Sequence, residues 1–577
     1  MIASFRSEFE RWLASDRLTP AQKEELLSIQ GNEELLKLRF GIEMDFGTAG
    51  LRSQMYMGPG CMNVFTVAQT TQAIAELILQ EGAASRGVAI AYDSRNNSAL
   101  FSETAAEVLA ENGITAYLFD GIRPTPELSF AVRELGCIAG INITASHNPK
   151  EYNGYKAYWE DGAQISPEQA KTVSAARENI DVLSGAKRMP LAEAISRGLV
   201  RMLGEDFDEK YLSAVLATAI DPGVISAVAD DLKIVYTPLH GAGYRLVPEI
   251  LRRIGLKHIY CVPEQMVLDG NFPTVKKPNP EYPDVFALGI EIADRVGSDL
   301  VVATDPDSDR IGVMARSSDG AFHTITGNQM GALLLDYIIR ARRENGTLSP
   351  DDYAVKSIVS TDLAYRIAEV QGVKLYDVLT GFKFIGEVIK NYETAGKPGR
   401  FLLGFEESYG YLTGSYARDK DAVGAALMIC EMTAYYSRRG LTLCDALEQL
   451  FATYGCYREG VTDIYMEGLD GIARRKRVME KLRKTPPATV GGDKVVKIGD
   501  FAAGTYTDLV TGASTPSGLP ASDVLVFLLA GGDKVIVRPS GTEPKVKIYF
   551  LTHADTEEAA EKKIEAYARD AARFAEV

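Results

Sequence analysis

A hydroxyl-bearing segment directly follows an apolar stretch in the first third of the chain. Residues 137–143 are apolar enough for a buried strand, and the sequence TASHNP follows at 144–149. Open α/β sheets bind their ligands beyond the ends of their strands. Ser146 is therefore a candidate nucleophile, with His147 beside it as a weaker candidate base or a positioning group. The alternative is an ordinary turn. A hydrolase elbow is excluded because G-x-S-x-G is absent.

Three carboxylates alternate after a second predicted strand, at residues 299–304. They are Asp305, Asp307 and Asp309. Their mutual repulsion favours a bound cation, and hard oxygen ligands suit Mg²⁺, which in turn suggests phosphoryl chemistry. An EF-hand is excluded because its sixth and twelfth positions are Arg310 and Arg316. A solvated acidic turn is the alternative.

Two further segments carry polar groups that could bind a substrate. In GFEESYG, residues 404–410, Glu406 and Ser408 could bind sugar hydroxyls. In RPSGTEP, residues 538–544, Arg538, two hydroxyls and a glycine could hold a phosphate group. Either segment could also be a simple turn. Together, the four segments supply what is needed to move a phosphoryl group on a sugar.

Alternating apolar runs and helical patterns predict the elements that position these segments. Strands at 87–91, 115–119 and 137–143 alternate with helices at 98–112 and 126–135, which indicates βαβ units on a mostly parallel sheet. The same cycle returns from residue 232 and from residue 353. We therefore expect three α/β domains with mixed sheets, at residues 1–200, 201–320 and 321–450.

The last part of the chain has a different pattern. Closely spaced strands are predicted at 524–529, 534–537 and 546–551, with a hairpin at Gly531-Gly532-Asp533. A terminal amphipathic helix follows, with Asp555 and Glu558 as its expected capping box. We therefore expect a smaller α+β domain at residues 451–577.

Composition limits the classes of partner. The 577 residues carry a net charge of −16, which disfavours nucleic acids and anionic membranes. Six scattered cysteines indicate free thiols in a reducing compartment. The start of the chain lacks the apolar core of a signal peptide, and the strongest apolar run, 524–530, is far too short for a membrane span. We expect a cytoplasmic protein.

With these four segments the chain resembles the α-D-phosphohexomutases. The four segments look like that family's phosphoserine, metal, sugar and phosphate loops, in order and over nearly the whole chain. Further matches are FGTAGLR at 46–52, PTP at 124–126 and TGFK at 380–383. YTPLHGAG at 236–243 and DGNFPTVKKPNPE at 269–281 are similar to the phosphoglucomutase and phosphopentomutase branch.

The resemblance implies four domains around a central cleft and a mechanism through phosphorylated Ser146. An oxygen of that residue and the three aspartates would hold Mg²⁺. Lys156 and Lys420 would be general acid/base groups, with a pKa lowered by burial near other cations. Arg310 would assist at the reacting phosphate. The implied substrate-binding residues are Thr48, Arg52, Thr380, Gly381, Lys383, Glu406, Ser408, Arg538, Ser540, Gly541, Thr542 and Lys547.

The implied reaction converts glucose 1-phosphate and glucose 6-phosphate into each other, with glucose 1,6-bisphosphate as intermediate and activator. The expected partners are small sugar phosphates, and the expected assembly is a monomer or homodimer. Pentose phosphates are the alternative substrates. A phosphomannomutase, a sugar-bisphosphate synthase, a hydrolase with an open cleft and a sugar-phosphate sensor are weaker alternatives. A sensor has no need of Ser146, the aspartates or the lysines.

Overall fold

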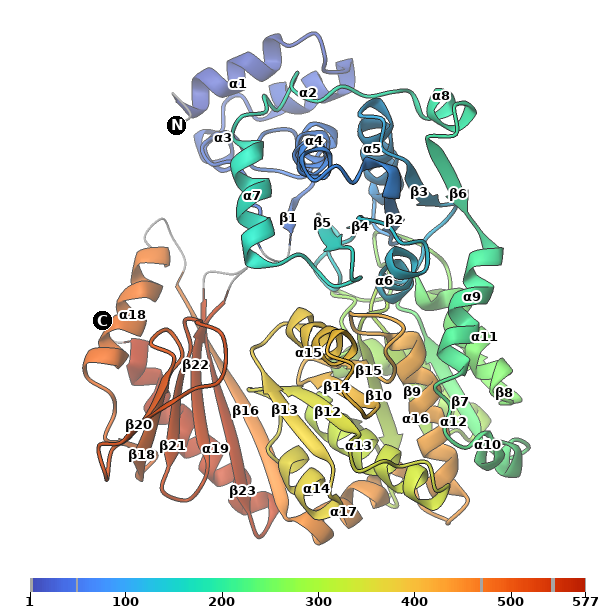
Figure 1. Ribbon diagram of the computed structural model, residues 1–577, viewed down its shortest axis with the longest axis vertical. Helices are drawn as coiled ribbons and strands as arrows, with labels where there is room; N and C mark the ends of the chain where they lie inside the picture. The colour runs from blue at the N-terminus through green and yellow to red at the C-terminus, as the bar shows by residue number, and fades with distance from the viewer. Residues whose placement is uncertain (1–3, 48–49, 467–470, 541–544, 576–577) are drawn as a thin grey trace. The chain divides into compact units, whose positions relative to one another are not determined.

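The computed structural model describes residues 4–47, 50–466, 471–540 and 545–575 (Figure 1). The chain divides into two compact units. The first unit comprises residues 1–325, 386–396 and 410–440, and the second comprises residues 326–385, 397–409 and 441–577. None of the described helices is long and apolar enough to cross a membrane.

The first sheet of the first unit has the strand order β1-β5-β4-β2-β3-β6. Strands β2, β3, β4 and β6 are parallel, while β5 runs antiparallel to β4 and β1 antiparallel to β5. The strand bounds are β1 Leu51–Gln54, β2 Val88–Tyr92, β3 Ala116–Phe119, β4 Ala139–Ile143, β5 Tyr152–Trp159 and β6 Val200–Leu203. The parallel strands β2 and β4 read as almost continuous apolar runs because they are buried.

Helices accompany this sheet, and three more precede it. Their bounds are α4 Val64–Gln80, α5 Ser98–Glu111, α6 Thr125–Glu134, α7 Pro167–Arg177 and α8 Leu191–Ser196. The three N-terminal helices are α1 Phe5–Ala14, α2 Pro20–Ser28 and α3 Glu33–Phe40. Trp12 and Phe40 are fully buried in a separate apolar cluster that these three helices form with residues near 182.

The second sheet of the first unit has the order β11-β10-β9-β7-β8. The parallel strands are β7 Lys233–Thr237, β8 His258–Cys261 and β9 Leu300–Thr304, and the antiparallel strands are β10 Ile311–Arg316 and β11 Phe322–Ile325. The helices are α9 Glu205–Leu216, α10 Pro222–Val228, α11 Gly243–Arg253 and α12 Ala287–Val296. Helix α16, Ala422–Ser437, contacts α10 and α11.

The second unit contains parallel strands and a large antiparallel sheet. Strand β12 pairs in parallel with β13 and β14, and their bounds are β12 Tyr353–Ser357, β13 Lys374–Val378 and β14 Phe401–Glu406. The accompanying helices are α13 Gly327–Glu344, α14 Leu363–Gln371 and α17 Leu443–Tyr454. Helix α15 Phe382–Thr394 begins in the second unit and continues into the first, and strand β15 Gly410–Leu412 belongs to the first.

The antiparallel sheet has the order β16-β23-β22-β21-β18-β19-β20. Its strands are β16 Cys456–Tyr465, β18 Asp493–Asp500, β19 Thr505–Asp508, β20 Ser514–Pro516, β21 Leu525–Leu529, β22 Lys534–Pro539 and β23 Lys545–Ala554, and β17 Thr489–Val490 pairs with β18. The helices are α18 Gly471–Lys484 and α19 Glu557–Ala571. One apolar cluster joins residues near 358 and 379 to this sheet.

Two local predictions for this last region have different outcomes. The hairpin between β21 and β22 is confirmed, with Gly532 at φ +92°, a conformation that favours glycine. The predicted capping box of Asp555 and Glu558 is wrong. Helix α19 begins one residue later, because Thr556 is extended and its hydroxyl accepts a hydrogen bond from the Ala559 amide.

Candidate active site

Ser146 lies on a tight loop between β4 and β5. Its backbone has φ +50°, the left-handed region that non-glycine residues rarely adopt. Its amide donates to the Thr144 hydroxyl at 2.8 Å, and that hydroxyl donates to Asp93 at 2.6 Å. These bonds fix the loop, so the Ser146 hydroxyl has a defined position. Backbone strain of this kind is common at functional sites.

A buried arginine that the sequence reasoning missed holds the same loop. Arg95 donates to the main-chain oxygens of Ser146 and Asn148, both at 2.5 Å, and to those of Pro149 and Tyr152 at 2.9 and 3.1 Å. Burial lowers its pKa to about 10. The available signal was its position just after the predicted strand at 87–91, beside Asp93.

The three aspartates lie together in the turn between β9 and β10. All are buried, and each offers an oxygen within 4.8 Å of those of the other two. Asp305 accepts a hydrogen bond from the Ser146 hydroxyl at 2.6 Å. The predicted nucleophile and the predicted metal loop, 159 residues apart in sequence, are therefore in direct contact.

The charges and the hydrogen bonding of this cluster are compatible with a bound cation. Burial, then repulsion from Asp307 and Asp309, raises the pKa of Asp305 far above its usual value. Burial also acts to raise the pKa of Asp309, but Lys156 and Lys420 outweigh it and the pKa is lowered. One oxygen each of Asp307 and Asp309 is buried and receives no hydrogen bond from any described residue. This oxygen-rich donor set fits Mg²⁺.

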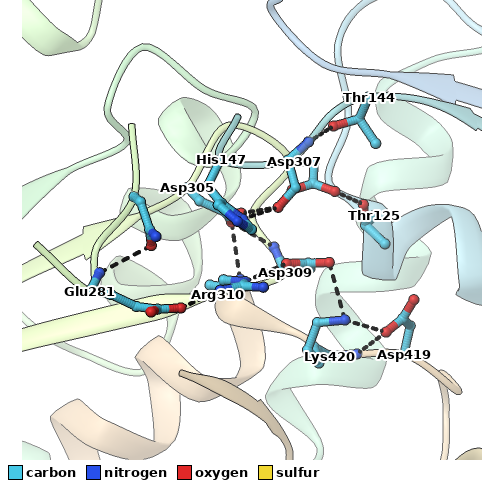
Figure 2. Close-up of polar contacts among 12 residues, drawn as sticks. Thr125, Thr144, His147, Glu281, Asp305, Asp307, Asp309, Arg310, Asp419 and Lys420 are labelled. Atoms are coloured by element: carbon cyan, nitrogen blue, oxygen red, sulfur yellow. Dashed lines mark hydrogen bonds and ion pairs between the residues drawn. The ribbon is translucent and has the colours of Figure 1, made fainter. Parts of the chain in front are cut away.

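The PTP segment contacts the metal loop at the start of α6. The Thr125 hydroxyl donates to Asp307 Oδ2 at 2.7 Å, and the Thr125 amide donates to the Asp307 carbonyl at 2.8 Å (Figure 2). The Asn142 amide group donates to the same threonine hydroxyl at 2.7 Å. Thr125 thus orients one carboxylate of the cluster, which motif spacing did not indicate.

Both predicted lysines contact the aspartate cluster. Lys156, on β5, lies 2.7 Å from Asp307 and 3.1 Å from Asp309. Lys420 lies 3.2 Å from Asp309 and 2.9 Å from Asp419 (Figure 2). The expectation of a lowered lysine pKa is wrong for Lys156. Burial acts to lower its pKa, but attraction from Asp307 and Asp309 outweighs burial and raises it.

Three further predicted residues surround Ser146. His147 Nδ1 lies 3.1 Å from the Ser146 hydroxyl oxygen. Burial, then the charges of Arg310 and Arg52, lowers the pKa of His147, so its ring is neutral near pH 7. Arg310 forms an ion pair with Glu281 (Figure 2). Arg52 donates to the Asn148 side chain at 3.0 Å.

The second unit brings the predicted sugar-binding residues together. The Gly381 amide donates to Glu406 Oε1 at 2.7 Å, so the TGFK and GFEESYG segments are adjacent. The Thr380 hydroxyl oxygen is buried and has no hydrogen-bond partner among the described residues. Ser408 lies half-buried in the turn after β14, and the Lys383 ammonium lies 5.4 Å from the Phe384 ring centre.

The predicted phosphate-binding residues begin at the end of β22. Arg538 lies directly opposite Lys547 across β22 and β23. Like charges in that position are unfavourable unless an anion lies between them. Asp463 lies opposite Lys547 on the other side, with 3.9 Å between their charged atoms. Ser540 is buried beside them, whereas Gly541, Thr542 and also Thr48 lie outside the described residues.

Tyr549 connects these two groups of residues. Burial raises its pKa, the charge of Glu407 raises it further, and Arg538 acts to lower it. The phenol therefore lies among charges from both the GFEESYG and the RPSGTEP segments. The candidate sugar-binding segment and the candidate phosphate-binding segment of the second unit therefore both act on the pKa of Tyr549.

Comparisons with known proteins agree with this construction. Four domain descriptions match: phosphoglucomutase/phosphomannomutase alpha/beta/alpha domain I at residues 43–183, domain II at 209–319, domain III at 326–454 and the C-terminal domain at 492–569. A phosphoglucomutase of Staphylococcus saprophyticus is 36% identical over 91% of this chain and 93% of its own. A Staphylococcus aureus phosphoglucomutase is 34% identical over 96% and 98%.

The chain belongs to the phosphoglucomutase/phosphomannomutase family, within the α-D-phosphohexomutases. Solved structures show the same fold. A Paramecium phosphoglucomutase, parafusin, has a TM-score of 0.65 at 16% identity and covers 93% of this chain and 96% of its own. A family protein of Burkholderia thailandensis has a TM-score of 0.64 at 18% identity, over 92% and 97%. The predicted family and fold class, three α/β domains and a C-terminal α+β domain, are confirmed.

Proposed function

We propose that this chain is a phosphoglucomutase that interconverts α-D-glucose 1-phosphate and glucose 6-phosphate through phosphorylated Ser146. One observation carries the proposal: the Ser146 hydroxyl is 2.6 Å from Asp305, inside a cluster of three buried aspartates. The staphylococcal relatives, which bear the name phosphoglucomutase, support glucose phosphates as the substrates. They do not favour the pentose alternative.

The first unit carries the reacting groups. Asp305, Asp307 and Asp309, with an oxygen of phosphorylated Ser146, would hold Mg²⁺, and the bound ion would neutralise charge on the transferring group. The bond between Ser146 Oγ and phosphorus breaks as a sugar hydroxyl oxygen bonds to phosphorus. The proton of that hydroxyl passes to a basic side chain, and Ser146 Oγ takes up a proton from an acidic side chain as it leaves phosphorus. In the second half of the cycle the other phosphate of the bisphosphate returns to Ser146.

Lys156 and Lys420 are the proposed acid and base. Each already contacts Asp309, at 3.1 and 3.2 Å, so each lies within reach of a group bound at Ser146. Loss of a proton from Lys156 requires that its carboxylate partners be compensated by another cation, because those partners raise its pKa. His147 is neutral and positions the Ser146 hydroxyl, while Arg310 and Arg52 bind the reacting phosphate.

The second unit carries most of the proposed substrate-binding residues. Glu406 and Ser408 would bind sugar hydroxyls, and Thr380, Gly381 and Lys383 would line the same place. Arg538, Ser540, Gly541, Thr542 and Lys547 would bind the phosphate that does not react. Thr48, in the first unit, is a further proposed substrate-binding residue. The Thr380 hydroxyl, which has no hydrogen-bond partner among the described residues, and the Arg538–Lys547 pair support these roles.

Glucose 1,6-bisphosphate is the proposed activator. A solved N-acetylphosphoglucosamine mutase variant of Aspergillus fumigatus, TM-score 0.52 at 12% identity, is described in complex with this bisphosphate. If the bisphosphate dissociates before the second transfer, Ser146 stays unphosphorylated. Free bisphosphate then phosphorylates Ser146 again. Cytoplasmic residence, the choice between monomer and homodimer, the domain boundaries and the central cleft stay predictions.

A substrate comparison tests the proposed function directly. With Mg²⁺ and the bisphosphate present, kcat/KM for glucose 1-phosphate should exceed the values for mannose 1-phosphate and ribose 1-phosphate by roughly tenfold or more, because hydroxyl-binding groups reject misplaced hydroxyls. The measurement is a coupled assay on all three sugars. A preference for ribose 1-phosphate would transfer the assignment to the pentose reaction.

Variants at Arg538 and Glu406 separate phosphate binding from sugar binding. Arg538→Ala removes a charge-assisted contact worth about 1.5–3 kcal/mol and should lower kcat/KM for glucose and ribose phosphates by similar factors. Glu406→Gln should lower them unequally, since the two sugars place their hydroxyls differently. Arg573→Ala, at an exposed arginine of the same unit, is the control. The opposite pattern, with Arg538→Ala changing the sugar preference, would contradict both assignments.

A further inference from the structure

Helix α18 has an unusual charge for this protein. Its 14 residues carry seven arginines and lysines against one glutamate, although the whole chain has a net charge of −16. Such a concentration of cations creates a locally positive potential on an otherwise acidic molecule. None of the motifs discussed above includes this helix.

Five of the seven cations of α18 are exposed, whereas Arg475 and Arg483 are half-buried. Val478, Met479 and Leu482 are buried in the core of the antiparallel sheet, which fixes the opposite face toward solvent. Three exposed cations follow one another at helical spacing on that face and form no ion pair with any described residue. They are Arg474, Arg477 and Lys484. We call these three residues the cationic stripe.

The helix is tied to the proposed phosphate-binding segment. Arg475 Nη1 donates a hydrogen bond to the main-chain oxygen of Ser540 at 2.7 Å. Ser540 lies two residues after Arg538, and α18 also contacts β23, which carries Lys547. Arg474 and Arg477 lie on the same helical turn as Arg475, but successive residues diverge by about 100° around a helix, so their exposed side chains do not face the Ser540 contact. The stripe therefore begins on the turn of α18 that contacts the proposed phosphate-binding segment.

A dianionic substrate meets two opposing fields as it approaches. The net negative charge of the protein repels it, whereas cations within a Debye length, about 8 Å at physiological salt, attract it.

We propose that the cationic stripe of α18 is an electrostatic guide that concentrates phosphate dianions at Arg538 and Ser540. This inference rests on the proposed function for its substrate, a sugar phosphate, but its ligand chemistry is that of any phosphate dianion. The stripe acts before the chemical step. It therefore sets kcat/KM and leaves kcat unchanged.

The test compares two charge-matched double variants. Arg474→Glu/Arg477→Glu reverses two stripe charges. The control, Lys494→Glu/Lys562→Glu, makes the same change in net charge at the other end of β22. The Lys494 carbonyl accepts a hydrogen bond from the Ala530 amide, just before that end of the strand. Lys562 precedes Lys563, which pairs with Asp533 at the same end. At low ionic strength the stripe variant should lose about tenfold in kcat/KM, with kcat retained. At 0.5 M salt the difference should shrink to about twofold.

The remaining outcomes are equally informative. The control should stay within about twofold of the wild type; equal losses in both variants would show a net-charge effect and overturn the guide. Unchanged kcat/KM in a folded stripe variant would also overturn it. Arg474→Gln/Arg477→Gln should give an intermediate loss and serves if the charge reversal disturbs folding. Calorimetry with inorganic phosphate at low salt gives a readout independent of catalysis. Weaker binding of inorganic phosphate in the stripe variant, but not in the control, supports the guide even if no sugar phosphate is a substrate.

Discussion

Ser146→Ala should lose mutase activity by about 10⁴-fold or more, because among the described residues 144–149 the Ser146 hydroxyl is the one that contacts the aspartate cluster and can carry the phosphoryl group. The hydroxyl it removes is the one that donates to Asp305 at 2.6 Å. A coupled assay with glucose 1-phosphate, Mg²⁺ and bisphosphate measures the loss. Intact-mass spectrometry should find one phosphate on part of the wild-type protein and none on the variant.

Two companion variants make this result interpretable. Ser146 has φ +50°, so alanine keeps the Cβ strain that serine already carries, whereas Ser146→Gly removes the hydroxyl in a residue that tolerates this conformation. Both should be inactive and folded by circular dichroism. Ser196→Ala, at an exposed serine of α8, should retain full activity. Full activity in either Ser146 variant would eliminate the phosphoserine mechanism.

Removal of the divalent cation should have the second large effect. Chelation by EDTA should abolish activity, and Mg²⁺ should restore it. Asp307→Asn keeps the shape of the side chain but removes one charge from the cluster, so kcat/KM should fall by about 100-fold or more. Asp319→Asn, at an exposed acid of the same unit, is the matched control.

Thermal unfolding gives a readout of metal binding that does not depend on activity. A ligand that binds only the folded state at about 100 times its Kd stabilises that state by about 2.7 kcal/mol. Mg²⁺ should therefore raise the Tm of the wild type and raise that of Asp307→Asn less. Full activity in metal-free protein, verified by elemental analysis, would refute the assignment of the three aspartates.

Much of the fold follows from local sequence patterns. The predicted helix at 98–112 is α5, Ser98–Glu111, and the predicted strand at 299–304 is β9, Leu300–Thr304. Both have long periodic or continuous apolar runs between clear turn residues, which are the most readable signals. The candidate nucleophile and the aspartates were readable for a related reason, since each follows such a strand directly.

Other parts of the site could not be read from local patterns. Arg95 and Thr125 act through contacts that join distant segments, and the charges of Glu407 and Arg538 act on Tyr549 from segments far apart in the chain. Spacing in one sequence carries no information on such contacts. The direction of the Lys156 pKa was also unreadable, because it depends on how many carboxylates the fold gathers around one ammonium group.

The interleaved composition of the first unit has a consequence for how the chain is made. Residues 410–440, with α16 and Lys420, belong to that unit, although segments of the second unit precede them in the chain. During synthesis at about 5–20 residues per second, Asp309 emerges on the order of ten seconds before Lys420. Until then, α10 and α11 lack the helix that covers them. A nascent or truncated chain ending near residue 325 would thus expose an apolar helix face and an acidic cluster that lacks Lys420.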